Sequence, residues 1–247
     1  MACRRIGYAF GVEKVATRAR SIPRRGFTPE LLRSLHTLAN RLLSEDAEHF
    51  RVHAETNDVV HVYERVDTGE PVGFQFWRTA PMELPGCRAV LGGKLRVDPE
   101  FRGRALHLRS GIRFYVENQL RHPATRFYRL SLASLYGFVS ITSALASYTM
   151  FDAAAPGPEG HAIRRAFEAL ASQSHYALDA TTSLFSVGIR VTEETAAQYS
   201  AAYYERPEAR AYIQANPGWR DGYYLGFWFR FTPSNLGKML RTIARKG

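Results

Sequence analysis

The sequence predicts one soluble domain of the α/β (α+β) class, a β-sheet with helices on its faces. Segments with strand-like and helix-like patterns alternate along the chain, which is the order expected when helices pack on a sheet. The composition is 45% hydrophobic and 23% charged, as in ordinary globular proteins. A chain of 247 residues buries enough surface to form a sizeable core without cross-links.

The net charge of +10 is concentrated at the two ends of the chain. Residues 1–25 contain seven Lys or Arg and one acid, Glu13, and residues 236–247 contain four bases and no acid. We interpret residues 1–25 as a basic N-terminal arm that precedes a single domain at 26–247. Basic ends of this kind are typical of a solvated surface, of a site for a phosphate-bearing partner such as nucleic acid, or of a transit peptide.

Local signals define the elements up to residue 50. An apolar stretch at 6–12 indicates a short strand, and the Pro- and Arg-containing stretch at 21–26 indicates a loop. Thr28 has the character of an N-cap, with Pro29 at the first helical position. Leucines at helical spacing then predict an amphipathic helix that continues to about Glu48.

The next elements form a hairpin and a strand–turn–helix unit. Residues 59–77 contain two stretches rich in β-branched and aromatic residues around a turn sequence, so they predict a β-hairpin. A third strand is expected at 89–97, followed by a turn at 98–103 and a helix that runs to about Leu120.

The second half of the chain continues the alternation. Strands are expected at 127–132, 184–191 and 223–231. Helices are expected at 139–148 and 162–170. Three further helices should begin at Thr192, at Pro207 (ending at the stretch 216–218), and after a cap at Ser234 or Asn235. Residues 152–160 predict a loop. The aromatic strand at 223–231 is expected to contribute to the core or, alternatively, to line a channel for a long acyl chain.

The segment from Ala89 to Glu117 carries the strongest chemical signal. A strand ends there in a turn of small residues that leads into a helix. The first N–H groups of a helix have no partners within the helix and lie at the positive end of its dipole, so they bind anions. Arg102 and Arg104 stand where they would reinforce a phosphate site. The alternative is a solvent-exposed helix start, decorated with arginines, that binds no ligand.

The sequence Val97-x-Pro99-x-x-Arg102-Gly103-Arg104-Ala105 resembles the coenzyme A pyrophosphate motif of the GNAT acyltransferase superfamily. The stretch from Ala144 to Tyr148 resembles the Ala-x-x-x-Tyr segment of the same superfamily. The resemblance covers residues 28–151, and residues 161–247 are expected to complete the sheet and add helices. It implies a central mixed, mostly antiparallel sheet and a divergent member of the superfamily.

The resemblance also implies site residues. The donor, acetyl-CoA or a longer acyl-CoA, would be held by Leu95, Arg96, Val97, Arg102, Gly103, Arg104, Ala105, Leu106 and His107. Tyr148 would protonate the departing thiolate. The nearest candidates for a general base are Glu64 and Glu100. Ala105 and His107 stand where the motif has Gly and Gly or Ala, so either the phosphate sits differently, another donor is used, or the cofactor site has been lost.

The implied function is transfer of an acyl group from a coenzyme A-type thioester to an amine acceptor. A first alternative is a transferase whose donor is acyl carrier protein or aminoacyl-tRNA, docked through the basic termini. A second is a GNAT-like binding module without catalysis, which recognises nucleic acid or a protein partner.

Other readings of the composition are disfavoured. Cys3 and Cys87 are the only cysteines, which indicates a reducing compartment, and we expect the cytoplasm. No apolar run of about 18 residues is present, so no transmembrane helix is expected. The spacing of His49, His53 and His61 matches no zinc pattern, so no metal is expected. Glycines at 92 and 93 inside a strand predict a bulge or a close backbone approach.

Overall fold

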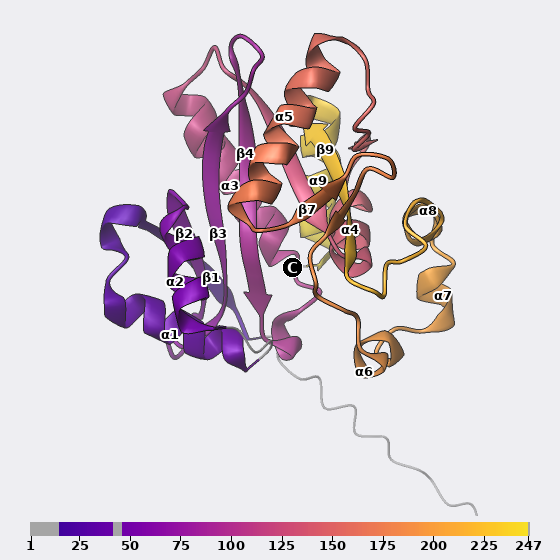
Figure 1. Cartoon of the computed structure of the whole chain (residues 1–247). Helices are drawn as coiled ribbons and strands as arrows, with labels where there is room; N and C mark the ends of the chain where they lie inside the picture. The colour runs from indigo at the N-terminus through magenta and orange to yellow at the C-terminus, as the bar shows by residue number, and fades with distance from the viewer. Residues whose placement is uncertain (1–14, 42–45, 247) are drawn as a thin grey trace, which may run out of the picture.

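The computed structural model describes residues 15–41 and 46–246. Its strands form one mixed sheet in the order β1-β2-β3-β4-β5-β9-β8-β7, with β6 paired to β9 (Figure 1). Within the described residues only the β4–β5 pair is parallel. The predicted fold class, a mostly antiparallel sheet flanked by helices, is confirmed. The predicted strand at 6–12 lies outside the described residues.

The strands are β1 Thr17–Pro23, β2 Val59–Arg65, β3 Pro71–Pro81, β4 Cys87–Val97, β5 Arg126–Ala133, β6 Thr149–Met150, β7 Ala177–Asp179, β8 Leu184–Ser186 and β9 Tyr223–Arg230. The α-helices are α1 Pro29–Asn40, α2 Ala47–Glu55, α3 Leu106–Arg121, α4 Leu135–Thr142, α5 Gly157–Gln173, α6 Glu193–Ala197, α7 Ala201–Tyr204, α8 Pro207–Ala215 and α9 Pro233–Lys246. Short 3₁₀ turns are η1 Arg24–Gly26 and η2 Pro99–Phe101.

The helices cover both faces of the sheet, and the alternation of side chains along each strand assigns them. On β3, Phe74 and Phe76 pack under α1 and α2, whereas Trp77 packs on the opposite face with α3, α4 and α9. On β4, Leu91 packs under α5 and Val90 packs toward α3. Thus α1, α2 and α5 lie on one face, with α3, α4, α8 and α9 on the other, and Figure 1 shows α5 in front of the sheet and α3 behind it.

Several local predictions are confirmed. The Oγ1 of Thr28 accepts a hydrogen bond from the N–H of Leu31 at 3.2 Å, and Pro29 is the first residue of α1. Residues 59–77 form the predicted antiparallel hairpin of β2 and β3. The strand at 89–97 and the helix that follows it are observed as β4 and α3. These elements are encoded by short-range patterns, which explains why the sequence was sufficient to locate them.

Two predictions in the N-terminal part were wrong. Residues 21–23 are not loop but the end of β1, an edge strand in which Ser21 faces His61 of β2. Pro23 is tolerated because it is the last residue of an edge strand. The single helix predicted to reach Glu48 is two helices, because α1 ends at Asn40 and the side chain of Asp46 accepts the N–H of His49 to begin α2.

Further corrections concern the second half. The helix predicted at 139–148 is α4, which begins at Leu135 and ends at Thr142, because the chain must then turn to pair Thr149 and Met150 with β9. The predicted loop at 152–160 ends early, since α5 begins at Gly157. The strand predicted at 184–191 has only three residues, and Thr232, not Ser234 or Asn235, caps α9 by accepting the N–H of Asn235.

Candidate functional site

The two parallel strands in the middle of the sheet separate partway along their length. β4 and β5 pair from Cys87 opposite Arg126 to Leu91 opposite Leu130. Beyond that point β4 continues along β3, and β5 continues along β9. The main-chain groups of residues 92–97 that face β5 therefore have no strand beside them. We call this region the β4–β5 divergence.

A bulge in β4 lies immediately after the divergence begins. Gly93 is opposite Phe76 and Arg96 is opposite Phe74 on β3. Lys94 and Leu95 therefore stand against a single residue, and Lys94 has a positive φ of 44°. The irregularity expected at Gly92 and Gly93 is thus centred one residue further along. It re-aims the main chain of β4 at the point where the neighbouring strand leaves.

The loop between β4 and α3 presents an uncapped helix start. Gly103 (φ 77°) and Ala105 (φ 55°) are both left-handed, and Ala105 occupies the N-cap position without a side-chain cap. The N–H groups of Leu108 and Arg109 donate to the carbonyl of Ala105. In the described part of the chain, no main-chain acceptor meets the N–H groups of Leu106 and His107. These two N–H groups remain available to an anion.

The two arginines of the loop have different roles. Arg104 donates from Nη1 to the carbonyl of Val15 at 2.6 Å and from Nη2 to the carbonyl of Glu100 at 3.2 Å, and its guanidinium lies over Phe101 at 4.5 Å. Arg104 therefore ties the loop to the chain before β1. Arg102 is exposed and uses only Nε, which donates to the carbonyl of Val97 at 3.2 Å. Its two terminal nitrogens are the arginine donors that face solvent at this helix start.

The remaining motif residues lie at the end of β4 and inside α3. Leu95, in the bulge, is 39% exposed, and Arg96 donates from Nη1 to the carbonyl of Leu95 at 3.1 Å. Val97 and Leu106 pack together in a small apolar cluster beneath the loop. Apolar packing therefore fixes the two ends of the loop, while its turn stays at the surface.

His107 connects α3 to α4. Its Nε2 lies 3.4 Å from the Oγ of Ser140. Burial, with smaller contributions from the charges of Lys246 and Arg129, lowers the pKa of His107 to about 4. The imidazole is therefore neutral at pH 7. The ring extends from α3 toward α4, where Ser140 is its neighbour.

Tyr148 follows α4 instead of lying on it and directly precedes β6. Its ring meets Phe138 edge-on at 5.4 Å and Phe227 at 6.3 Å. Burial, together with the charge of Glu208, raises the pKa of Tyr148. The phenol therefore keeps its proton at neutral pH, as a general acid must.

Neither candidate for the general base, Glu64 or Glu100, lies at the β4–β5 divergence. Glu64 is only 5% exposed and lies on β2, which β3 separates from β4. Its carboxylate accepts hydrogen bonds from Arg18 Nε at 3.2 Å and from Arg20 Nε at 2.7 Å. These two ion pairs anchor β1 to β2. Glu100 is exposed in η2 beside the loop.

Two residues at the divergence were not identified from the sequence. His53, on α2, lies against β4 so closely that a Cβ added at Gly93 would be 2.8 Å from its Nε2. Arg129, on β5, is buried with 6% exposure beside Gly92. A charged residue in the middle of the apolar strand at 127–132 was a usable signal for Arg129. For His53 no local signal exists, because only the packing of α2 on the sheet brings it to Gly93.

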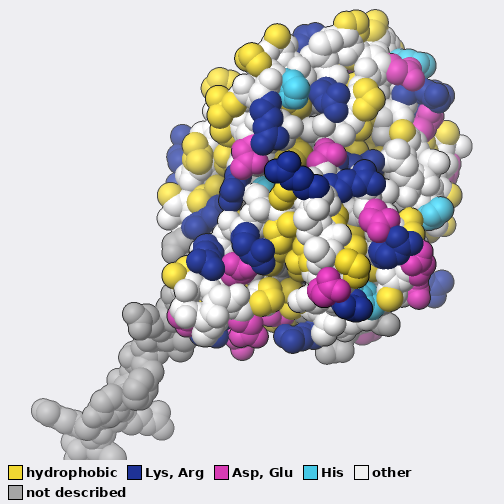
Figure 2. All heavy atoms as spheres, turned by 90° about the vertical axis from the view of Figure 1, so that its left-hand side faces the viewer, with side chains coloured by type: hydrophobic (Ala, Val, Ile, Leu, Met, Phe, Trp, Pro, Cys, Tyr) yellow, Lys and Arg dark blue, Asp and Glu magenta, His cyan; other side chains and the backbone are white. Residues whose placement is uncertain are grey.

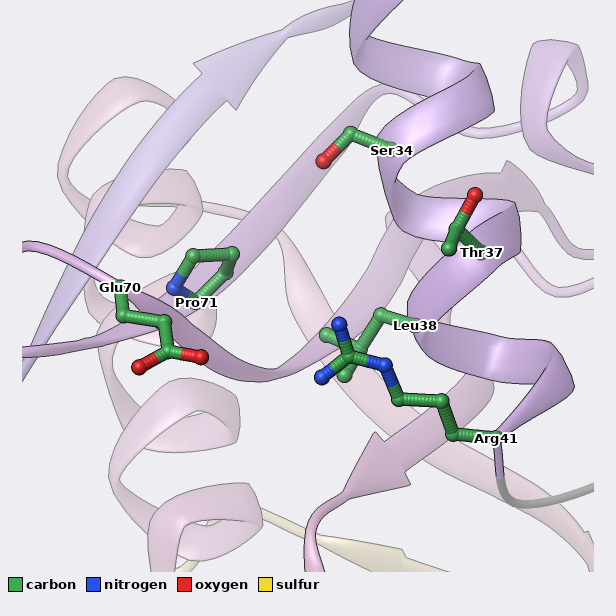
Figure 3. A pocket seen from close by; sticks show the side chains of 6 residues that line it. All are labelled: Ser34, Thr37, Leu38, Arg41, Glu70 and Pro71. Atoms are coloured by element: carbon green, nitrogen blue, oxygen red, sulfur yellow. The ribbon is translucent and has the colours of Figure 1, made fainter.

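Two surface recesses lie elsewhere. A recess of about 300 Å³ separates α1 from the β2–β3 turn, and Figure 3 shows Arg41 and Glu70 extending into it from opposite sides. Burial raises the pKa of Asp98, which follows β4, and the charge of Arg41 opposes this effect. A second recess, of about 540 Å³, lies beside the C-terminal half of α3. Neither is lined by a described residue of the divergence.

Three further findings concern the surface charges, possible metal ligands and the helices. Figure 2 shows basic and acidic side chains interspersed on the face seen at the left of Figure 1, where no single basic patch dominates. Within residues 15–41 and 46–246, no cluster of three His, Cys, Asp or Glu has the arrangement of a metal site. No helix in the same part of the chain is both long and apolar enough to cross a membrane.

No family model matches the chain, and no curated protein matches it. Solved structures that match include the NatC complex bound to Gag peptide and CoA (TM-score 0.40, 11% identity, covering 87% of this chain and 99% of that one). They also include NAA60 from Arabidopsis thaliana with a bisubstrate analogue (0.37, 15%, 54% and 88%) and the GNAT family N-acetyltransferase YhbS from Escherichia coli with CoA (0.37, 13%, 52% and 67%). Another similar solved structure is glucosamine-6-phosphate N-acetyltransferase from Arabidopsis thaliana (0.33, 16%, 45% and 79%).

Proposed function

We propose that this protein transfers an acyl group from a coenzyme A thioester to an amine. The observation that carries the proposal is the β4–β5 divergence next to the uncapped start of α3. Beyond Leu91 the edge of β4 has no strand on its β5 side, and within the described part of the chain no main-chain acceptor meets two N–H groups of the helix start. One extended molecule with a phosphate at one end and a polar carbonyl at the other satisfies both.

In this proposal the donor phosphates bind at residues 102–107. The N–H groups of Leu106 and His107 and the free terminal nitrogens of Arg102 supply the donors. Leu95, Arg96 and Val97 form the wall of β4 along which the thioester arm lies. Acetyl-CoA and longer acyl-CoA both fit this description, and no metal is required for the chemistry.

The reaction proceeds by direct attack of the amine nitrogen on the thioester carbonyl carbon. The new C–N bond forms, negative charge collects on the carbonyl oxygen, and N–H groups of β4 at the bulge stabilise it. The C–S bond then breaks, and Tyr148 gives its proton to the departing thiolate. The amine must lose a proton, and His53 is better placed at β4 to take it than Glu64, whose carboxylate is ion-paired. Glu100 remains a candidate at the loop.

A donor attached to a large phosphate-bearing carrier is the second candidate. It is favoured by α9, which packs in the same apolar cluster as α3 and has Arg245 and Lys246 in its last turn. Basic residues near the loop between β4 and α3 would attract the negative charge of acyl carrier protein or aminoacyl-tRNA. The proposed setting is the cytoplasm, where these donors occur and the buried free thiol of Cys87 stays reduced.

Titration calorimetry with coenzyme A, acetyl-CoA and decanoyl-CoA tests the proposal. We expect binding that Arg102→Gln weakens about tenfold, as for one charge-assisted hydrogen bond to phosphate. Arg109→Gln, on the second turn of the same helix, is the matched control and should bind normally. Once an amine acceptor has been identified, Tyr148→Phe should lower kcat and change KM much less.

No binding of any of the three donors would contradict the acyl-CoA proposal. RNA or carrier-protein binding that falls steeply with salt and is lost in a Lys246→Gln variant would then support the second candidate. Binding of RNA without any transfer activity would instead indicate a binding module.

A further inference from the structure

Arg129 is a charged side chain inside the protein core. It lies on β5 and is 6% exposed. Its Nη1 donates to the main-chain carbonyls of Val90, at 3.3 Å, and Leu130, and its guanidinium lies over the ring of Trp77 at 5.0 Å. These contacts hold the plane of the guanidinium in place, and none of them neutralises its charge.

Arg129 has no anionic partner in the described part of the chain. No carboxylate lies within ion-pair distance of it, and neither its Nε nor its Nη2 makes a hydrogen bond there. Burial alone lowers the pKa of Arg129 to about 9. By contrast, the buried carboxylate of Glu64 is matched by Arg18 and Arg20. A buried charge without a counter-charge is costly, so proteins that keep one normally use it.

The position of Arg129 relates it to the β4–β5 divergence. It pairs with Val90, and only one further rung, Leu91 with Leu130, separates it from the point where the strands part. Its side chain lies on the α3 face of the sheet with Trp77. A Cβ added at Gly92 would be 2.9 Å from its Nη2, so the guanidinium packs directly against the main chain of β4 at the first residue beyond the paired segment.

We propose that Arg129 binds a carboxylate of the reacting substrate at the β4–β5 divergence. A planar guanidinium with Nε and Nη2 unoccupied matches the two oxygens of a carboxylate. The carboxylate belongs either to the distal end of a dicarboxylic acyl group on the donor or to an amino-acid acceptor. This inference rests on the proposed acyl transfer for the identity of the substrate, and the carboxylate is inferred from the buried charge that has no anionic partner among the described residues.

Two matched ligand pairs test the inference by titration calorimetry. Succinyl-CoA and butyryl-CoA have the same chain length and differ by a carboxylate in place of a methyl group. L-Alanine and ethylamine differ by the carboxylate alone and are measured without coenzyme A. We expect the carboxylate member of one pair to bind about tenfold more tightly than its partner, which corresponds to one charge-assisted contact. The pair that shows the preference identifies the source of the carboxylate.

Arg129→Met is expected to reduce this preference to less than about twofold without lowering the Tm of the free protein, because it removes an unpaired buried charge. Arg126→Met, at the exposed start of the same strand, should keep the preference. If wild-type protein binds coenzyme A but discriminates neither pair, the inference is overturned and the proposed function stands. If coenzyme A does not bind, the alanine–ethylamine pair alone decides: a preference for L-alanine supports the inference, and equal binding overturns it. A preference that survives in Arg129→Met also overturns it.

Discussion

Acidification from about pH 7.5 to about pH 5 should destabilise the protein through His61, and His61→Asn should remove that part of the loss. His61 is fully buried on β2, where its Nδ1 lies 2.7 Å from the Oγ of Ser110 and its ring meets Phe114. Burial, assisted by the charge of Arg113 and opposed by Glu117, lowers the pKa of His61 from 6.5 to about 4. The folded protein therefore holds a neutral imidazole at pH values where the unfolded chain binds a proton.

The sign and size of the effect follow from this difference. The pKa of His61 is lower in the folded state than in the unfolded chain. The protein therefore keeps its full unfolding free energy above pH 6.5 and loses part of it as the pH falls from 6.5 toward 4. Each pH unit in that range is equivalent to about 1.4 kcal/mol, so the loss at pH 5 is about 2 kcal/mol. His107, whose pKa is lowered to about 4 for the same reason, adds a loss of the same sign.

Urea unfolding at the two pH values provides the measurement. The wild type should lose about 2 kcal/mol more of its unfolding free energy on acidification than His61→Asn does. The asparagine keeps a polar atom near Ser110 but does not titrate. His122→Asn, at an exposed position, is the matched control and should behave as the wild type. Equal losses in wild type and His61→Asn would refute the reasoning, because the imidazole would then not be shielded from protons.

Three further predictions concern stability. Gly92→Ala places a Cβ 2.8 Å from the ring of Trp77, and should cost about 1–3 kcal/mol; an unchanged Tm would mean that the indole has room to move. Thr28→Ala removes the cap of α1 and should cost about 1 kcal/mol in urea unfolding, whereas a change below a few tenths would show that the cap is dispensable. Tyr212→Phe leaves the buried carbonyl of Ala133 without the hydroxyl that donates to it at 2.7 Å, so a loss of about 1–3 kcal/mol is expected, and a more stable variant would contradict the assigned bond.

Part of the fold and part of the candidate site could be predicted because their sequence signals are local. The Val97-to-Ala105 motif, the cap at Thr28 and the hairpin each depend on residues within one turn or one short strand pair. The helix start that follows the motif was likewise predicted from its own residues. What the sequence could not show was whether Arg104 faces a ligand. In the structure the Nη1 of Arg104 donates to the carbonyl of Val15, 89 positions away, a contact that the motif does not indicate.

Long-range packing decided the rest. Glu64 has the sequence character of a base, but the pairing of β1 with β2 brings Arg18 and Arg20 onto its carboxylate. Tyr148 lies outside α4 because pairing with β9 ends that helix at Thr142. The periodic pattern of a segment carries no information about these partners, since they come from distant segments.

By itself the sequence determined that strands and helices alternate, that residues 89–117 form a strand, a loop and an uncapped helix start, and that this start is suited to an anion. Only the tertiary structure decided that β4 and β5 separate after Leu91, and that Arg129 lies beside that point with no carboxylate partner among the described residues. The physical reason is that secondary structure follows from neighbouring residues, whereas the separation of two strands and the burial of a charge depend on every element packed against them.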